Sequence, residues 1–116
     1  MNTERLHRLQ VALEQILPIL ITEYKPEKII LFGSMVGGEV ESWSDIDLLI
    51  VKETNQPFFR RLREVALLCR ASVGIDFLVY TPQEVEAMLA AKNPFHVEVF
   101  LTGKVVYERE FAEAVA

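Results

Sequence analysis

Hydrophobic residues recur every three or four positions through the first part of the chain, and this is the spacing of one face of an α-helix. The pattern predicts an amphipathic helix over residues 3–23. Pro18 lies within this helix, and because proline has no backbone N–H to donate, we expect a kink or an early end there. The apolar positions that define the helix are Leu6, Leu9, Leu13, Ile16, Leu17 and Leu20.

Short apolar runs bounded by turn residues predict four β-strands. The runs read KIILF, DIDLLIV, GIDFLVY and KVVYE, and they occupy residues 28–32, 45–51, 74–80 and 104–108. The connection between the first two runs permits an antiparallel hairpin, whereas the second and third runs are joined through a helix. The sheet is therefore expected to be mixed rather than purely parallel.

Helical segments are predicted between and after these strands. One occupies residues 57–72, with Pro57 in its first turn. Thr81 and Glu84 form the ends of a capping-box sequence, which begins a helix that extends to residue 91. A short helix follows residues 93–94. The helix over residues 57–72 is expected to carry three residues on one apolar face: Leu62, Ala66 and Cys69.

Taken in order, the elements read α-β-β-α-β-α-α-β along a single domain of residues 1–116. The predicted fold class is α/β, of the α+β type, with a mixed β-sheet of about four strands flanked by helices. A chain of 116 residues is long enough to bury an ordinary core in one domain.

The composition is that of an ordinary folded domain, and it narrows the classes of function. Hydrophobic residues make up 51% of the chain and charged residues 25%, which excludes a disordered or low-complexity protein. The net charge of −5 argues against tight, non-specific binding to nucleic acid. No apolar run approaches the roughly 18 residues of a membrane span, and the N-terminus lacks the apolar core of an export signal. With Cys69 as the single cysteine, we expect a cytoplasmic protein with no membrane partner.

Charged residues are unevenly distributed along the chain. Residues 39–47 contain four acids and no base, whereas residues 60–70 contain four arginines and one acid. An acidic centre beside a basic helix would suit a metal-and-phosphate site. Ordinary surface charge explains the basic helix equally well.

Three aspartates occur where burial makes a carboxylate costly. Asp45 and Asp47 begin the second predicted strand and share one of its faces, because side chains alternate along a strand; Asp76 lies within the third strand. Two carboxylates on one face repel each other, and partial burial adds a desolvation cost. A divalent cation removes both penalties, and oxygen ligands suit Mg²⁺ or Mn²⁺. If the third strand lies beside the second, the three carboxylates could hold two ions for phosphoryl or nucleotidyl transfer.

The same aspartates also have structural explanations. Asp45 stands where a turn or cap residue is common, and Asp47 and Asp76 could form ion pairs with Arg63 or Lys104.

A Gly-Ser pair directly follows the first predicted strand. Gly33 allows the backbone to turn and to approach a ligand closely, and the Ser34 hydroxyl with exposed N–H groups can hold phosphate oxygens. Ten residues separate Ser34 from Asp45, so a hairpin would bring this turn beside the aspartates. The sequence has no Gly-rich lysine loop, no GxGxxG and no GxSxG, which excludes P-loop, Rossmann and hydrolase-elbow sites.

The segment LFGSMVGGEVESWSDIDLLIV resembles the GSx10DxD signature of the DNA polymerase beta-type nucleotidyltransferase superfamily. In its small size the whole chain resembles the minimal nucleotidyltransferases, which are the antitoxins of HEPN/minimal nucleotidyltransferase pairs. The resemblance implies that Gly33 and Ser34 bind the phosphates of a nucleotide and that Asp45 and Asp47 hold two Mg²⁺ ions. It also implies that Asp76 binds one ion and helps to deprotonate an acceptor hydroxyl, with ATP or another NTP as co-substrate and Mn²⁺ as the alternative metal.

Members of that superfamily transfer a nucleoside monophosphate, commonly AMP from ATP, onto a hydroxyl and release pyrophosphate, and the antitoxin members modify a tyrosine of the partner toxin. The resemblance therefore implies a protein adenylyltransferase that acts on a HEPN-type partner. Larger relatives hold the acceptor in a second domain, so we expect the rest of this site to come from a partner protein or a homo-oligomer. The apolar residues Phe95, Val99 and Phe100 are expected to cover the sheet and in part to face that partner.

The loop after Gly-Ser differs from many small members of the superfamily, which carry arginines there. Residues 35–38 read MVGG, and Arg60, Arg61 or Arg63 could compensate from the next helix. The alternative function is a catalytically weak antitoxin of the same fold that neutralises a partner by complex formation. A third hypothesis is a stand-alone transferase that modifies a small molecule such as an aminoglycoside.

Overall fold

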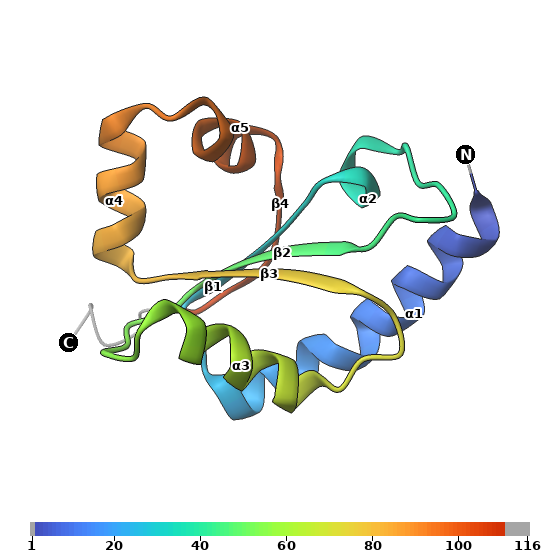
Figure 1. Ribbon diagram of the computed structural model, residues 1–116, viewed down its shortest axis with the longest axis horizontal. Coiled ribbons are helices and arrows are strands. Elements are labelled where there is room, and N and C mark those ends of the chain that lie inside the picture. The colour runs from blue at the N-terminus through green and yellow to red at the C-terminus, as the bar shows by residue number, and fades with distance from the viewer. Residues whose placement is uncertain (1, 111–116) are drawn as a thin grey trace.

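The computed structural model describes residues 2–110 and contains one mixed sheet with helices on both faces (Figure 1). No helix within these residues is long and apolar enough to cross a membrane. The helices are Thr3–Ile19 (α1), Ser34–Gly37 (α2), Phe58–Cys69 (α3), Pro82–Ala91 (α4) and Pro94–Thr102 (α5), and a π-helical turn follows α1 at Leu20–Tyr24. The strands are Lys28–Phe32 (β1), Ile46–Val51 (β2), Ile75–Tyr80 (β3) and Lys104–Glu108 (β4).

The sheet has the strand order β3-β2-β1-β4. Strand β1 pairs antiparallel with β2 and with β4, whereas β2 and β3 are parallel because α3 carries the chain back across the sheet. The predicted mixed, four-stranded sheet is therefore confirmed. The register sets Phe32 opposite Asp47 on one side of β2 and Asp76 opposite Asp47 on the other.

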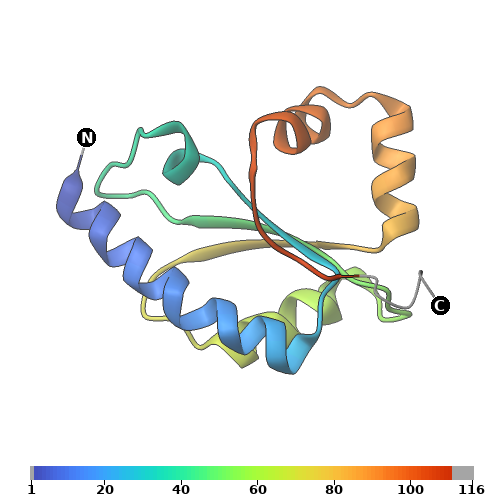
Figure 2. The same ribbon diagram turned by 180° about the vertical axis from the view of Figure 1, so that it is seen from behind.

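Two layers of helices bury the two faces of the sheet (Figures 1 and 2). Helices α1 and α3 cover one face, and α4 and α5 cover the other. Alternate strand residues point to opposite faces, so each layer receives its own apolar set. The α1 and α3 layer buries Leu9, Ile16, Ile29, Leu31, Leu48, Ile50 and Val65, and the α4 and α5 layer buries Ile30, Leu49, Val51 and Val99.

The first helix changes its winding near Pro18, as the sequence predicts. The α-helix ends at Ile19, and the π-helical turn continues to Tyr24. Because Pro18 has no N–H, it cannot complete the regular pattern of hydrogen bonds at this point. Lys25 then adopts a left-handed conformation with φ of 56° and its N–H donates to Leu20 O, which closes the helix.

The buried face of α3 differs from the prediction. Cys69 is buried as expected, but Ala66 is exposed and Leu62 is only half-buried. The central buried positions are instead Arg61 and Val65. An apolar pattern could not indicate this face, because one of its buried residues is charged.

The capping box of α4 is confirmed in both directions. Thr81 Oγ1 accepts a hydrogen bond from Glu84 N at 3.2 Å, and Glu84 Oε1 accepts one from Thr81 N at 2.8 Å. Pro82 occupies the first turn, where its missing N–H costs nothing. This fixes the start of the helix that follows β3.

Candidate active site

The turn after β1 places backbone directly beside Asp47. Gly33 has φ of 79°, a conformation that favours glycine, and it begins the short helix α2, where only a turn was expected. A Cβ atom at position 33 would overlap the Asp47 Oδ2 atom. Glycine is therefore required here for two reasons, the backbone conformation and the space that the carboxylate occupies.

Asp47 and Asp76 lie side by side on neighbouring parallel strands. Burial raises the pKa of Asp47 to about 6, and the charge of Asp76 together with a hydrogen bond to it adds to the effect. Asp47 is half-buried and Asp76 is exposed. The two carboxylates thus repel each other unless a proton or a cation lies between them.

Asp45 has a different environment. It precedes β2, and its Oδ1 atom lies 3.2 Å from Arg5 Nη2 of α1. A Cβ atom at Gly74 would also come within 2.6 Å of Asp45 Oδ1, so the side chain occupies space that only glycine leaves free. Sequence reasoning missed both Arg5 and Gly74. Forty positions separate Arg5 from Asp45, and no local pattern indicates such a contact.

The carboxylates fit a divalent cation in part. Within residues 2–110, neither Asp47 nor Asp76 has a salt bridge, so the proposed pairs with Arg63 or Lys104 are not formed. Two oxygen ligands that lack a positive partner match the preference of Mg²⁺ or Mn²⁺. The same part of the chain contains no group of three His, Cys, Asp or Glu side chains placed to hold a metal ion. The structure brings Asp47 and Asp76 together, and Arg5 holds Asp45.

A cavity of about 460 Å³ opens beside Asp47 on the α5 face of the sheet. Its walls are largely apolar, and the rings of Phe32 and Phe95 meet there edge to face, 6.1 Å apart between centroids. Glu98 and Thr102 of α5 add polar groups. The lining residues are Phe32, Gly33, Val36, Gly37, Asp47, Phe95, Glu98, Val99 and Thr102.

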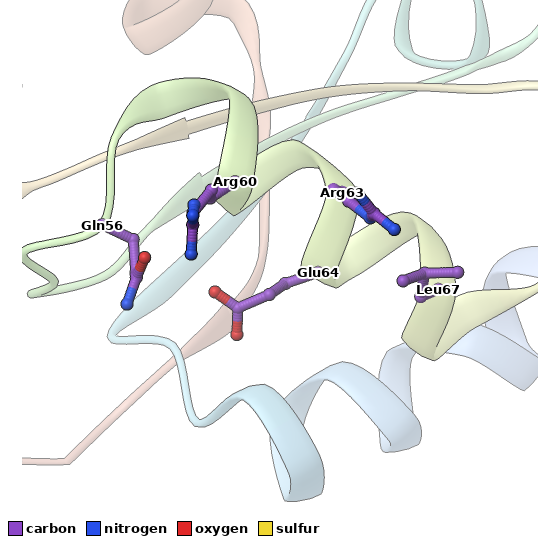
Figure 3. Close-up of a pocket in the computed structure, with 5 residues that line it drawn as sticks. All are labelled: Gln56, Arg60, Arg63, Glu64 and Leu67. Atoms are coloured by element: carbon purple, nitrogen blue, oxygen red, sulfur yellow. The ribbon is translucent and has the colours of Figure 1, made fainter.

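The arginines of α3 lie away from this cavity. Arg60 and Arg63 line a separate hollow of about 470 Å³ together with Gln56, Glu64 and Leu67 (Figure 3). Helix α3 packs on the face of the sheet opposite α5. The expectation that Arg60 or Arg63 replaces the missing loop arginines is therefore wrong, because the sheet separates them from Asp47.

The Arg61 side chain is also unable to reach the cavity, because it is held by hydrogen bonds to other parts of the fold. Arg61 is 6% exposed as a residue; Nη1 donates to Glu84 Oε1 at 2.7 Å and to Val79 O at 3.0 Å, and Nε donates to Gln56 O at 2.8 Å. Each of these bonds supports the fold. Arg61 is thus a structural residue and cannot bind a nucleotide.

Known proteins share this architecture. A crystal structure of a candidate nucleotidyltransferase from Sulfolobus solfataricus matches with a TM-score of 0.66 and 21% identity over 94% of this chain and 88% of that one, which shows a nucleotidyltransferase fold. Residues 14–112 match the family described as polymerase beta, nucleotidyltransferase, and the chain therefore belongs to that family. No curated protein matches the sequence. The class of activity is nucleotidyl transfer, a reaction that generally uses an NTP and a divalent metal.

Proposed function

We propose that this chain is a Mg²⁺-dependent nucleotidyltransferase that moves AMP from ATP onto a hydroxyl of a HEPN-type partner protein and releases pyrophosphate. The observation that carries the proposal is the pair Asp47 and Asp76, side by side next to Gly33. Family membership supports nucleotidyl transfer in general. The identity of the nucleotide and the identity of the partner protein are our proposals.

Each residue of the site has its own role in the proposed transfer. Gly33 leaves the space that the Asp47 carboxylate occupies beside the turn, and the Ser34 hydroxyl and the backbone at the start of α2 bind phosphate oxygens. Asp76 is the more exposed carboxylate, so an incoming hydroxyl can reach it, and we assign to it the proton of that hydroxyl. Mg²⁺, when bound by Asp47 and Asp76, neutralises charge that builds up on the transferred phosphate. Positioning and charge neutralisation provide most of the rate in such transfers.

The surroundings of the cavity support a protein acceptor. Phe32 and Phe95 offer aromatic edges and faces to a planar group, which suits the side chain of a tyrosine. Phe95 is 48% exposed and Leu101, also on α5, is 78% exposed. Exposed apolar side chains on the helix that lines a cavity are typical of surfaces that bind another protein.

Transfer of a radiolabel tests the proposal. The chain is incubated with α-labelled ATP, Mg²⁺ and the protein encoded by the adjacent gene. We expect label on the partner with the wild type and none with Asp47→Asn. Glu86→Gln is the matched control, because it removes the same charge from an exposed position on α4. Absence of label with the wild type would contradict the proposal.

A second candidate is a binding module of the same fold that neutralises its partner without catalysis. Two observations favour it. Residues 35–38 contain no lysine or arginine that could bind a triphosphate, and Arg5 already forms an ion pair with Asp45. It predicts a tight complex with equal affinity for wild type and Asp47→Asn, and no label transfer. Label transfer to an aminoglycoside without any protein partner would instead support a small-molecule transferase.

A further inference from the structure

Arg5 reaches from the first turn of α1 to the loop that precedes β2. Its Nη2 atom lies 3.2 Å from Asp45 Oδ1, and its Nε atom donates to Ser44 O at 2.9 Å. The Arg5 side chain is 19% exposed and that of Asp45 is 40% exposed. A guanidinium on a helix thus neutralises one carboxylate of the DxD pair.

The position of Arg5 is fixed by further contacts. Asn2 caps α1 by accepting a hydrogen bond from Arg5 N at 2.8 Å, and Asn2 N donates to Val40 O at 2.7 Å. Ser44 is 8% exposed, and its Oγ accepts from Glu41 N at 2.9 Å. Both views of the fold show the N-terminal end of α1 beside the loop between α2 and β2 (Figures 1 and 2). The Arg5 guanidinium is therefore placed against Asp45 by the fold.

The two main bonds of Arg5 are separable. Nε binds a backbone carbonyl, whereas Nη2 binds the carboxylate, so Asp45 can be released while the helix stays docked at Ser44. Asp45 precedes Ile46 in a strand register that sets Asp47 beside Asp76, and its side chain lies over Gly74. Side chains two positions apart share a face of an extended chain, so release of Asp45 from Arg5 would free a third carboxylate on the face that carries Asp47.

We propose that Arg5 is the counter-ion of Asp45 in the metal-free protein and that a divalent cation must displace it to engage all three carboxylates. The inference rests on the proposed metal-dependent transfer. Arg5 is then a positioning residue that sets the metal affinity through Asp45. It lowers the affinity for a first cation, because the cation competes with a charge that is already in place.

This inference is tested by isothermal titration calorimetry, in which Mn²⁺ alone is added to the full chain and its binding affinity is measured. We expect Arg5→Ala to tighten Mn²⁺ binding by about fivefold or more. Arg5→Gln should give the same gain, because it removes the charge but keeps a donor for Ser44 O. Arg8→Ala is the matched control: it removes one positive charge from the same helix, but Arg8 is 65% exposed and pairs only with Glu4 among the described residues. Its Mn²⁺ affinity should stay within about twofold of wild type.

A double-mutant cycle separates competition at Asp45 from a general change of charge. In the Asp45→Asn background, Arg5→Ala should give no gain in Mn²⁺ affinity. Unchanged or weaker binding in both Arg5→Ala and Arg5→Gln, or an equal gain in Arg8→Ala, would overturn the inference and leave the Asp47 and Asp76 site intact. Absence of Mn²⁺ binding in wild type and in both Arg5 variants would overturn the metal-dependent function as well.

Discussion

Arg61 of α3 and Glu84 of α4 form an ion pair of 2.7 Å that joins helices on opposite faces of the sheet. Arg61 is buried, and its Nη1 atom also donates to the Val79 carbonyl of the edge strand β3. The pair therefore fastens both helical layers to the strand that carries Asp76.

Arg61→Ala should lower the free energy of unfolding by about 2 kcal/mol, because the Val79 and Gln56 carbonyls lose their buried donor and Glu84 loses its partner. The Glu84 side chain is 41% exposed, which limits the cost of leaving it alone. Urea unfolding measures the effect. Arg60→Ala, on the exposed side of the same helix, should change stability by no more than about 0.5 kcal/mol. Equal losses in the two variants would show that the ion pair contributes nothing specific.

The same pair predicts how stability depends on pH. The hydrogen bond from Arg61 holds the pKa of Glu84 below its ordinary value. A carboxyl group whose pKa is lowered by folding stabilises the folded state fully when the pH is above its pKa in the unfolded chain. This stabilisation is lost as the pH falls through the lowered pKa of the folded state. The stability difference between wild type and Glu84→Gln should therefore be constant above about pH 5 and shrink below it. A difference that grows on acidification would contradict this prediction.

Gly33→Ala should abolish transfer of the nucleotide and destabilise the fold by about 1 to 2 kcal/mol. The new Cβ atom would strain a backbone with φ of 79° and push against Asp47 Oδ2. Gly37→Ala is the matched control for stability within α2, because a Cβ atom there meets nothing within 4 Å. Radiolabel transfer and thermal unfolding distinguish the two variants. Retention of transfer in Gly33→Ala would show that close approach at this turn is dispensable.

Asp47→Asn should stabilise the metal-free protein by about 1 kcal/mol, because it removes the desolvation of the half-buried Asp47 carboxylate and its repulsion by Asp76. The wild type should gain thermal stability when Mg²⁺ is added, and the variant should gain none. Differential scanning fluorimetry with and without EDTA measures both effects. A Mg²⁺-dependent rise of equal size in Asp47→Asn would place the ion elsewhere.

Local patterns predicted the strands well. The bounds of β1 and β4 agree with the sequence, because each strand is a short apolar run between turn residues. The start of α4 was predictable from its capping box, since both partners lie within four residues. The side-by-side position of Asp47 and Asp76 followed once β3 was placed next to β2.

Long-range polar contacts were not predictable. The bond between Arg5 and Asp45 joins residues forty positions apart, and Arg61 is buried only because Glu84, Val79 and Gln56 surround its guanidinium. Hydrophobic periodicity carries no information on such pairs, since it treats every charged residue as exposed. Sequence reasoning therefore anticipated that Asp47 and Asp76 lie side by side but missed Arg5, which pairs with Asp45.

The parallel register of β2 and β3 limits where this chain tolerates insertions. Side chains alternate between the two faces, so one extra residue between Ile75 and Asp76 would turn that carboxylate under α3 and place the inserted residue beside Asp47. The loop that precedes α3 carries no such restriction, because added length there leaves the pairing of both strands unchanged. Homologues of differing length should thus vary in that loop and keep a constant spacing within the strand.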